Sequence, residues 1–370
     1  MMNNFILLLC LTLILSACSR ELSVSRSFFS PGEGVLSPST DRLSSDCMAN
    51  PLFDACVFLK NPVAQERASV SLADLDGKRR YGVKLRGLAP SGNLENKWFK
   101  VLTLDTPRFS LFRRDPLKDS YRADGSFAEQ ISAYYWANLT LEYLQAQQGA
   151  AAVRDLKIYA DDAFTGFVAK SNSIHLEKTA AQTPRAFSGE VVIQLLGQAL
   201  AQHLSNHRLV TKNPAQHKVC LSQPKGCCQT NLGCAQALSG AFGDYLAGMV
   251  YPSQPRVGET VAGDADGQEL CGLMRDPLAL SSRTKDQIFG ACPQATGHAA
   301  LMGAWYASLW WKLKADHPAH AKVIDRVYFD HAKAWTDQST FAGAKTEAQN
   351  LARGTPIETA LAAMFTAAGI

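Results

Sequence analysis

The sequence predicts an α+β fold in which an N-terminal sheet lobe and a mainly helical C-terminal lobe are joined by a central buried helix. Short segments of alternating apolar and polar residues, typical of strands, occur between about residues 68 and 111, where they predict a small antiparallel sheet, and again between 156 and 176. The segment 188–204 is apolar around most of its circumference, as in a buried helix, and helical spacing dominates after it. The expected parts are a signal peptide (1–18), a tether (19–62), the N-terminal sheet lobe (63–187), and the central helix and helical C-terminal lobe with a cysteine-rich insertion (188–370).

The N-terminus has the features of a bacterial lipoprotein signal. Residues 5–15 form an apolar run that is too short to span a bilayer, and the run ends in Leu15-Ser16-Ala17-Cys18, which resembles a lipobox. The resemblance implies that Cys18 carries a lipid, and Ser19 resembles the signal for sorting to the outer membrane. We expect an outer-membrane lipoprotein of the bacterial cell envelope, on the periplasmic or the surface face, with secretion without a lipid as the alternative.

Composition and charge describe an ordinary globular chain. Of its 370 residues, 46% are hydrophobic and 19% are charged. The net charge of +4 is small for this length, and basic clusters such as residues 78–80 are typical of a solvated surface. No nucleic-acid partner is expected, and the sequence leaves the oligomeric state open.

Ten cysteines agree with export to an oxidising compartment. Cys10 belongs to the signal and Cys18 to the lipid anchor, which leaves an even set that predicts disulfide bonds of open pairing. A metal site between Cys220 and Cys234 is the alternative, but the spacing lacks paired Cys-x-x-Cys units. The predicted disulfide cysteines are Cys47, Cys56, Cys220, Cys227, Cys228, Cys234, Cys271 and Cys292.

The predicted elements in the middle of the chain follow the order helix, strand, edge segment, strand and buried helix. The helix carries an apolar stripe at helical spacing, and Ser188 is a good N-cap residue for the buried helix. The five segments are 127–144, 156–160, 161–168, 173–176 and 188–204.

Two motifs accompany this order of elements. Asp162-Ala163-Phe164 lies in the edge segment, and Val191-Val192 leads into Gln194-Leu195-Leu196-Gly197-Gln198 in the buried helix. In order and register they resemble the catalytic domain of thermolysin-like and fungalysin-like metallopeptidases. There an Asn-Ala-Phe edge strand pairs with the substrate backbone and a Val-Val-x-His-Glu-x-x-His helix binds zinc. The resemblance implies a two-lobed, zincin-like fold with a substrate cleft.

A third motif extends the resemblance, which runs from about Phe127 onward. Residues 237–247 are similar to the family's Gly-Glu-x-x-Ser-Asp-Tyr helix, whose glutamate is the third zinc ligand. In the better register Asp244 matches the supporting aspartate and Gly240 the ligand, whereas a poorer register places Asp244 at the ligand position. Residues 303–310 resemble another family helix, and the aromatic residues there are predicted to lie mostly in the core.

The positions that would bind zinc in this family lack suitable donors. The family needs two histidines one turn apart, a carboxylate ligand, and a glutamate that takes a proton from zinc-bound water. The neutral amide of glutamine binds zinc weakly, and neither glycine nor leucine binds metal or accepts a proton. We expect no zinc and no catalysis here. The degenerate positions are Gln194, Leu195, Gln198 and Gly240.

Other histidines provide alternatives. His203 and His207 are four residues apart, and with His217 or His175 they would form a displaced metal site. Such a pair near a helix end is more often a solvated or capping feature. His298 is expected to line the cleft or to be structural. No Gly-x-Ser-x-Gly elbow and no glycine-rich phosphate loop occurs in the sequence.

The first functional hypothesis is a non-catalytic, zincin-like envelope lipoprotein, anchored to the membrane by its lipid and without a cofactor. It would bind an extended peptide or a protein partner in the former substrate cleft by strand addition around residues 162–164. The alternatives are an active metallopeptidase with a displaced or atypical metal site, and a structural envelope lipoprotein. The sequence does not identify the partner.

Overall fold

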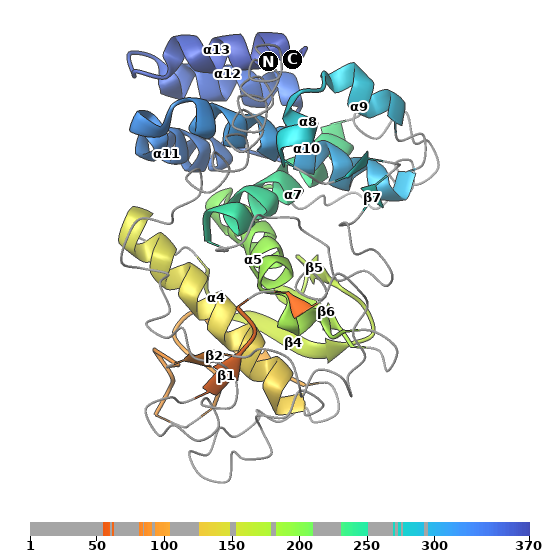
Figure 1. The fold of residues 1–370 in the computed structure, drawn as a ribbon, viewed down its shortest axis with the longest axis vertical. Coiled ribbons are helices and arrows are strands. Elements are labelled where there is room, and N and C mark those ends of the chain that lie inside the picture. The colour runs from red at the N-terminus through yellow and green to blue at the C-terminus, as the bar shows by residue number, and fades with distance from the viewer. Residues whose placement is uncertain are drawn as a thin grey trace, which may run out of the picture.

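The computed structural model describes residues 55–59, 61–62, 81–83, 85–90, 93–103, 126–148, 153–178, 183–209, 231–250, 269–270, 273–274, 277–291 and 295–370. The α+β class is confirmed there: a mixed sheet with its helices comes first, and the chain after residue 231 is mainly helical (Figure 1). The predicted signal peptide and Cys18 lie outside these residues. None of the helices in the described part is both long enough and apolar enough to cross a membrane.

The described strands form one four-stranded sheet and two small antiparallel pairs. They are β1 (Ala55–Val57), β2 (Tyr81–Val83), β3 (Phe99–Leu102), β4 (Leu156–Asp162), β5 (Gly166–Val168), β6 (Ser173–Glu177), β7 (Glu269–Leu270) and β8 (Leu273–Met274). The sheet has the order β3-β4-β6-β5. β3, β4 and β6 are parallel, and β5 is antiparallel to β6 at one edge. The small pairs are β1 with β2 and β7 with β8.

The first strands pair differently from the prediction of one small antiparallel sheet over residues 68–111. β2 and β3 fall within that segment but belong to different sheets, and β3 is parallel to β4. A parallel pair needs a crossover connection, which here contains helix α4 (Ser126–Gln148), and alternation within a strand does not reveal its partner. α4 confirms the helix predicted over 127–144. β1 is buried, although it lies in the segment predicted as a tether.

Helices α4 and α5 (Gly189–Leu204) pack against each other and against the sheet, α4 on β3 and β4 and α5 on β5 and β6 (Figure 1). Along β4, Leu156 and Ile158 are fully buried in the core. The alternate residues Lys157 and Tyr159 are half-buried and point to the opposite side, because successive side chains of a strand alternate. We call this opposite side the outer face of the sheet.

The central helix is confirmed, and most of its residues are buried. Ser188 occupies the N-cap position, although its hydroxyl makes no capping hydrogen bond. Helix α7 (Asn231–Val250) crosses α5 at two glycines. A Cβ atom on Gly197 would lie 2.5 Å from the Gly243 Cα, and one on Gly243 would lie 2.3 Å from the Gln194 carbonyl oxygen. The two backbones approach this closely only because neither glycine has a side chain.

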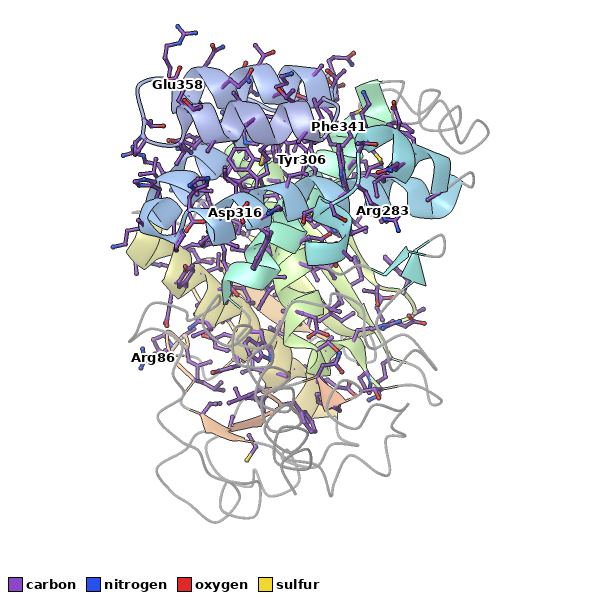
Figure 2. All side chains as sticks on the ribbon, turned by 45° about the horizontal axis from the view of Figure 1, so that its top comes forward. Arg86, Arg283, Tyr306, Asp316, Phe341 and Glu358 are labelled. Atoms are coloured by element: carbon purple, nitrogen blue, oxygen red, sulfur yellow. The ribbon has the colours of Figure 1, made fainter. Side chains whose placement is uncertain are left out.

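The C-terminal part consists of packed helices around an aromatic core. Helix α10 (Ala295–Asp316) crosses α7 where a Cβ atom on Gly303 would lie 2.6 Å from a carbonyl oxygen of α7. Trp305, Tyr306 and Trp310 are fully buried, which confirms their predicted place in the core. Tyr306 packs against Phe341, with ring centroids 5.2 Å apart (Figure 2). The helices are α8 (Pro277–Ser281), α9 (Lys285–Ala291), α10 (Ala295–Asp316), α11 (Ala321–Ala332), α12 (Phe341–Ala352) and α13 (Glu358–Ala367), with short 3-10 turns at Arg185–Phe187 and Pro318–His320.

Candidate functional site

Two glutamines interrupt the buried surface of α5. Gln194 and Gln198 are half-buried, whereas the other residues from 191 to 202 are buried. Being one turn apart, the glutamines lie on the same side of the helix. Gly240 on α7 is also half-buried, and a Cβ atom added there would meet nothing within 4 Å. These predicted positions therefore share partial access to solvent.

A direct contact joins two of the predicted site residues across the α5–α7 crossing. The Gln194 Nε2 donates a hydrogen bond of 2.7 Å to Oδ1 of Asp244, which is itself buried. Gly240 stands one turn before Asp244 on the same helix. Leu195, at the position where the resemblance expects a general base, is buried in the core. The site thus has polar groups at positions 194 and 244 and none at 195.

The predicted edge segment lies against one of the two crossing helices, because β5 contacts α5. β5 is the last strand of the sheet on its side, and no described strand pairs with its outer edge. Phe164, in the turn before β5, is 45% exposed. Among the described residues, the large hydrophobic side chains with such exposure are Phe164 and Leu351. An exposed aromatic ring beside an available strand edge is suited to contact another chain.

A bulge in β4 determines where Asp162 points. Between the pairs Tyr159–His175 and Asp162–Glu177, β4 has one residue more than β6. Such an extra residue turns the following side chain to the other face. Asp162 therefore joins His175 on the outer face and does not continue the buried row of Ile158.

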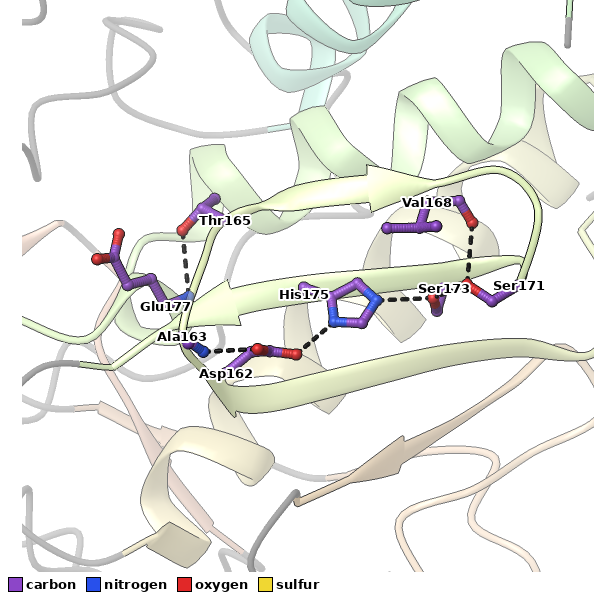
Figure 3. Close-up of polar contacts among 8 residues, drawn as sticks. All are labelled: Asp162, Ala163, Thr165, Val168, Ser171, Ser173, His175 and Glu177. Atoms are coloured by element: carbon purple, nitrogen blue, oxygen red, sulfur yellow. Dashed lines mark hydrogen bonds and ion pairs between the residues drawn. The ribbon is translucent and has the colours of Figure 1, made fainter. Parts of the chain in front are cut away.

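On the outer face His175 lies at the centre of a polar and aromatic cluster. Its ring stacks between Tyr159 and Phe164, with centroid distances of 4.9 and 4.6 Å. Its Nδ1 bonds to Oδ2 of Asp162, and its Nε2 lies 2.7 Å from the Ser173 hydroxyl oxygen (Figure 3). The other Asp162 oxygen accepts the Ala163 amide N–H at 2.6 Å.

The cluster continues to the protein surface. The hydroxyl oxygens of Ser171 and Ser173 are 2.6 Å apart; Ser171 is exposed, whereas Ser173 is buried (Figure 3). The sequence predicts a role for His175 only as a metal ligand, and it predicts none for Ser171 or Ser173. The Ser-x-Ser-x-His spacing was an available signal, since it places Ser173 and His175 on one face of β6 and Ser171 in the turn just before that strand. The role of Asp162 depends on the bulge, which no local pattern shows.

The alternative metal site is not assembled in the described part of the chain. The rings of His203 and His207 lie edge to face, 4.6 Å apart, and Nε2 of His203 is 3.2 Å from Oδ1 of Asn172. Burial lowers the pKa of His203, and the neighbouring His207 acts in the same direction. Over the described ranges, no group of three or more His, Cys, Asp and Glu residues is placed to hold a metal. His217 and the side chain of His298 lie outside the described positions.

Two fully buried groups titrate far from their ordinary ranges. Burial raises the pKa of the Glu129 carboxyl on α4 to about 7, although Lys178, 2.9 Å away, opposes the shift. Burial lowers the pKa of His331 on α11 to about 4. The His331 Nδ1 lies 3.0 Å from the Tyr328 carbonyl oxygen, and its Nε2 is 3.2 Å from the Tyr306 hydroxyl. Neither group belongs to the α5–α7 crossing.

Two of the predicted disulfide cysteines, Cys56 and Cys234, are described, and both are buried. The other predicted cysteines, from Cys47 to Cys292, lie outside the described ranges. The pairing therefore stays a prediction.

Neither the models of known protein families nor the curated proteins contain a match to the chain. The class of protein that the described structure defines is an α+β protein, with a mixed sheet that ends in an antiparallel edge strand and a mainly helical C-terminal part. The finer relation to metallopeptidases is a proposal, for which the α5–α7 crossing and β5 supply the support.

Proposed function

We propose that the protein is a zincin-like envelope lipoprotein without peptidase activity, and that it binds an extended peptide or a protein partner by strand addition to β5. The observation that carries the proposal is the position of β5, an antiparallel edge strand that contacts α5 and has no described neighbour on its outer side. Main-chain groups at such an edge give affinity, and side-chain pockets give specificity.

The α5–α7 crossing supports the zincin-like part of the proposal. The better register of the family motif pairs Asp244 with the aspartate that supports the zinc site, and Asp244 accepts a hydrogen bond from Gln194, at the first ligand position. In the same register Gly240 replaces the third ligand, and the space around it is open. The hydrogen bond between Gln194 and Asp244 and the open space at Gly240 both agree with the family register. They favour a common architecture over a chance similarity of the motifs.

The residue types support the absence of peptidase activity. The Gln194 amide nitrogen donates to Asp244, and its lone pair is delocalised into the carbonyl group, so only the neutral, weakly binding amide oxygen could be offered to a metal. A glycine at 240 supplies no ligand, and the buried Leu195 cannot take a proton from water. A tetrahedral catalytic zinc needs three protein ligands and one water, which these positions do not provide.

Purified protein is expected to contain no stoichiometric zinc and to leave casein uncut. Metal analysis by mass spectrometry and cleavage with and without a chelator measure both properties. The positive control is the triple variant Gln194→His, Gln198→His, Gly240→Glu, which is expected to take up zinc. Its hydrolysis should stay poor, since a missing general base typically costs about 10²–10⁴-fold. One equivalent of zinc with chelator-sensitive cleavage in the unmodified protein would instead favour the displaced site at His203 and His207.

Peptides selected from a displayed library for binding to the protein are expected to lose about tenfold or more of their affinity on Phe164→Ala. An exposed aromatic ring next to the strand edge is the kind of residue that dominates small interfaces. The matched control is Leu351→Ala, which removes an apolar side chain of similar exposure (40%) on α12 and should leave binding unchanged. Hydrogen exchange at residues 166–168 should slow in the complex. Equal losses in both variants would contradict strand addition, and a library without binders would favour the structural lipoprotein.

A further inference from the structure

We propose that Ser171 is a nucleophilic serine that attacks carboxylic esters, activated through Ser173 by His175 and Asp162. The four groups form one continuous chain on the outer face of the sheet, from the exposed turn before β6 to the bulge of β4 (Figure 3). A hydroxyl, an imidazole and a carboxylate in this order, each within hydrogen-bond reach of the next, constitute the general arrangement of an activated nucleophile. The inference does not rest on the proposed function, because it uses neither α5 nor strand addition to β5; the two share only Phe164, whose ring packs on His175.

The directions of the hydrogen bonds follow from the donors and acceptors present. Ionised Asp162 only accepts, so Nδ1 of His175 carries a proton, and in the neutral imidazole Nε2 is then an acceptor. Ser173 must donate to Nε2, since nothing else in this contact carries a proton. Because Ser173 has used its single proton, Ser171 donates to Ser173 at 2.6 Å. The Val168 carbonyl oxygen, at 3.4 Å from Ser171, is a weaker competing acceptor.

Two aromatic rings and a backbone amide fix the base and its carboxylate partner in place. His175 is held between the rings of Tyr159 and Phe164, and Asp162 is held by the Ala163 amide. Orientation of the base by a third group is what gives such arrangements their reactivity. Ser173 is buried and transmits the proton, whereas Ser171 is the hydroxyl that a substrate can reach.

The reaction balances without a cofactor. Oγ of Ser171 attacks the ester carbonyl carbon, its proton passes to Ser173, and the proton of Ser173 passes to Nε2 of His175. The bond from the carbonyl carbon to the alcohol oxygen breaks, and the proton held by His175 returns through Ser173 to the departing alkoxide, because Oγ of Ser171 is now part of the acyl ester. A water molecule that gives its proton to Ser173 then attacks the acyl carbon, the bond from this carbon to Oγ of Ser171 breaks, the carboxylic acid is released and the returned proton restores Ser171.

The full-length protein treated with a fluorophosphonate probe is expected to lose fluoride and form one covalent adduct on Ser171, located by tryptic mass spectrometry. Ser171→Ala should abolish the adduct without affecting folding, because the residue is exposed in a turn. Ser173→Ala should slow labelling by about 10²-fold or more, as expected when the path to a general base is lost. His175→Phe should do the same while keeping a ring between Tyr159 and Phe164. Circular dichroism of each variant verifies the fold.

Ser282→Ala is the matched control, since Ser282 is also exposed and its hydroxyl donates to a backbone carbonyl at 2.8 Å. It should label at the parent rate. With p-nitrophenyl acetate, the parent should release p-nitrophenolate and become acetylated on Ser171, with or without a chelator. No adduct, an adduct on another residue, or undiminished labelling of Ser173→Ala would overturn the proposal. None of these outcomes bears on peptide binding at β5, so the two proposals fail separately.

Discussion

Gly243→Ala is expected to lower the free energy of unfolding by about 3 kcal/mol, at the upper end of the usual cost of overpacking a core. The new Cβ atom would lie 2.3 Å from the carbonyl oxygen of Gln194, a backbone atom in the middle of α5. A side chain could rotate away from such an overlap, but a helix backbone cannot. The α5–α7 crossing must therefore open, and the 2.7 Å contact between Gln194 and Asp244 is expected to break with it.

Urea denaturation followed by tryptophan fluorescence measures the effect. Gly240→Ala is the matched control, because it lies one turn earlier on the same helix and its added methyl group meets nothing within 4 Å. There the better helix propensity of alanine should raise stability by about 0.5–1 kcal/mol. Similar shifts of the midpoint for both variants would show that α5 and α7 do not cross at Gly243.

The second large effect is a dependence of the free energy of unfolding on pH, to which two buried groups, Glu129 and His331, contribute with opposite signs. A carboxyl pKa raised from 4.5 to about 7, as for Glu129, corresponds to about 3 kcal/mol. The folded protein holds this proton more tightly than the unfolded chain. The contribution of Glu129 to the free energy of unfolding is fully present below pH 4.5 and is lost as the pH rises to about 7.

His331 has the opposite sign. Its pKa is lowered from 6.5 to about 4, again equivalent to about 3 kcal/mol. The unfolded chain binds this proton more tightly, so the contribution is fully present above pH 6.5 and is lost as the pH falls through about 4. Between about pH 4.5 and 6.5 the Glu129 and His331 contributions change in opposite directions and nearly cancel.

Single variants are expected to expose each slope. Relative to the parent, the free energy of unfolding of Glu129→Gln should rise by about 3 kcal/mol as the pH rises from 4.5 to 7. That of His331→Phe should rise by about the same amount relative to the parent as the pH falls from 6.5 to 4. Denaturant titrations at a series of pH values measure these differences. Thr346→Ser, at an exposed position on α12, changes no titrating group and is the control, with a flat difference curve. A flat curve for Glu129→Gln would mean that Glu129 is ionised in the folded protein at neutral pH.

Local pattern was sufficient to predict the elements but not their partners. The central helix was predicted over 188–204 and is found over 189–204, because its apolar circumference and its N-cap residue are both local signals. The buried Trp305 and Trp310 were predicted from helical spacing in the same way. The parallel pairing of β3 with β4 depends on contacts across α4, which lie beyond any short window.

The same distinction between local and long-range information applies to the candidate site. The register that relates Gln194 to Asp244 came from motifs, and these two side chains are in contact. The outer-face cluster around His175 was missed, because Asp162 reaches it only through an extra residue in β4. A sequence pattern of period two cannot reveal where that period is interrupted.

The length of β5 bears on self-association. An exposed strand edge is a template for further copies of the same chain, and proteins avoid sheet growth by keeping such edges short. β5 has three residues, so a second copy pairing edge to edge would gain few main-chain hydrogen bonds. A longer extended ligand can add contacts beyond the strand, such as one with the ring of Phe164. An edge of this size discriminates against polymerisation while it remains open to a ligand that brings its own anchoring side chains.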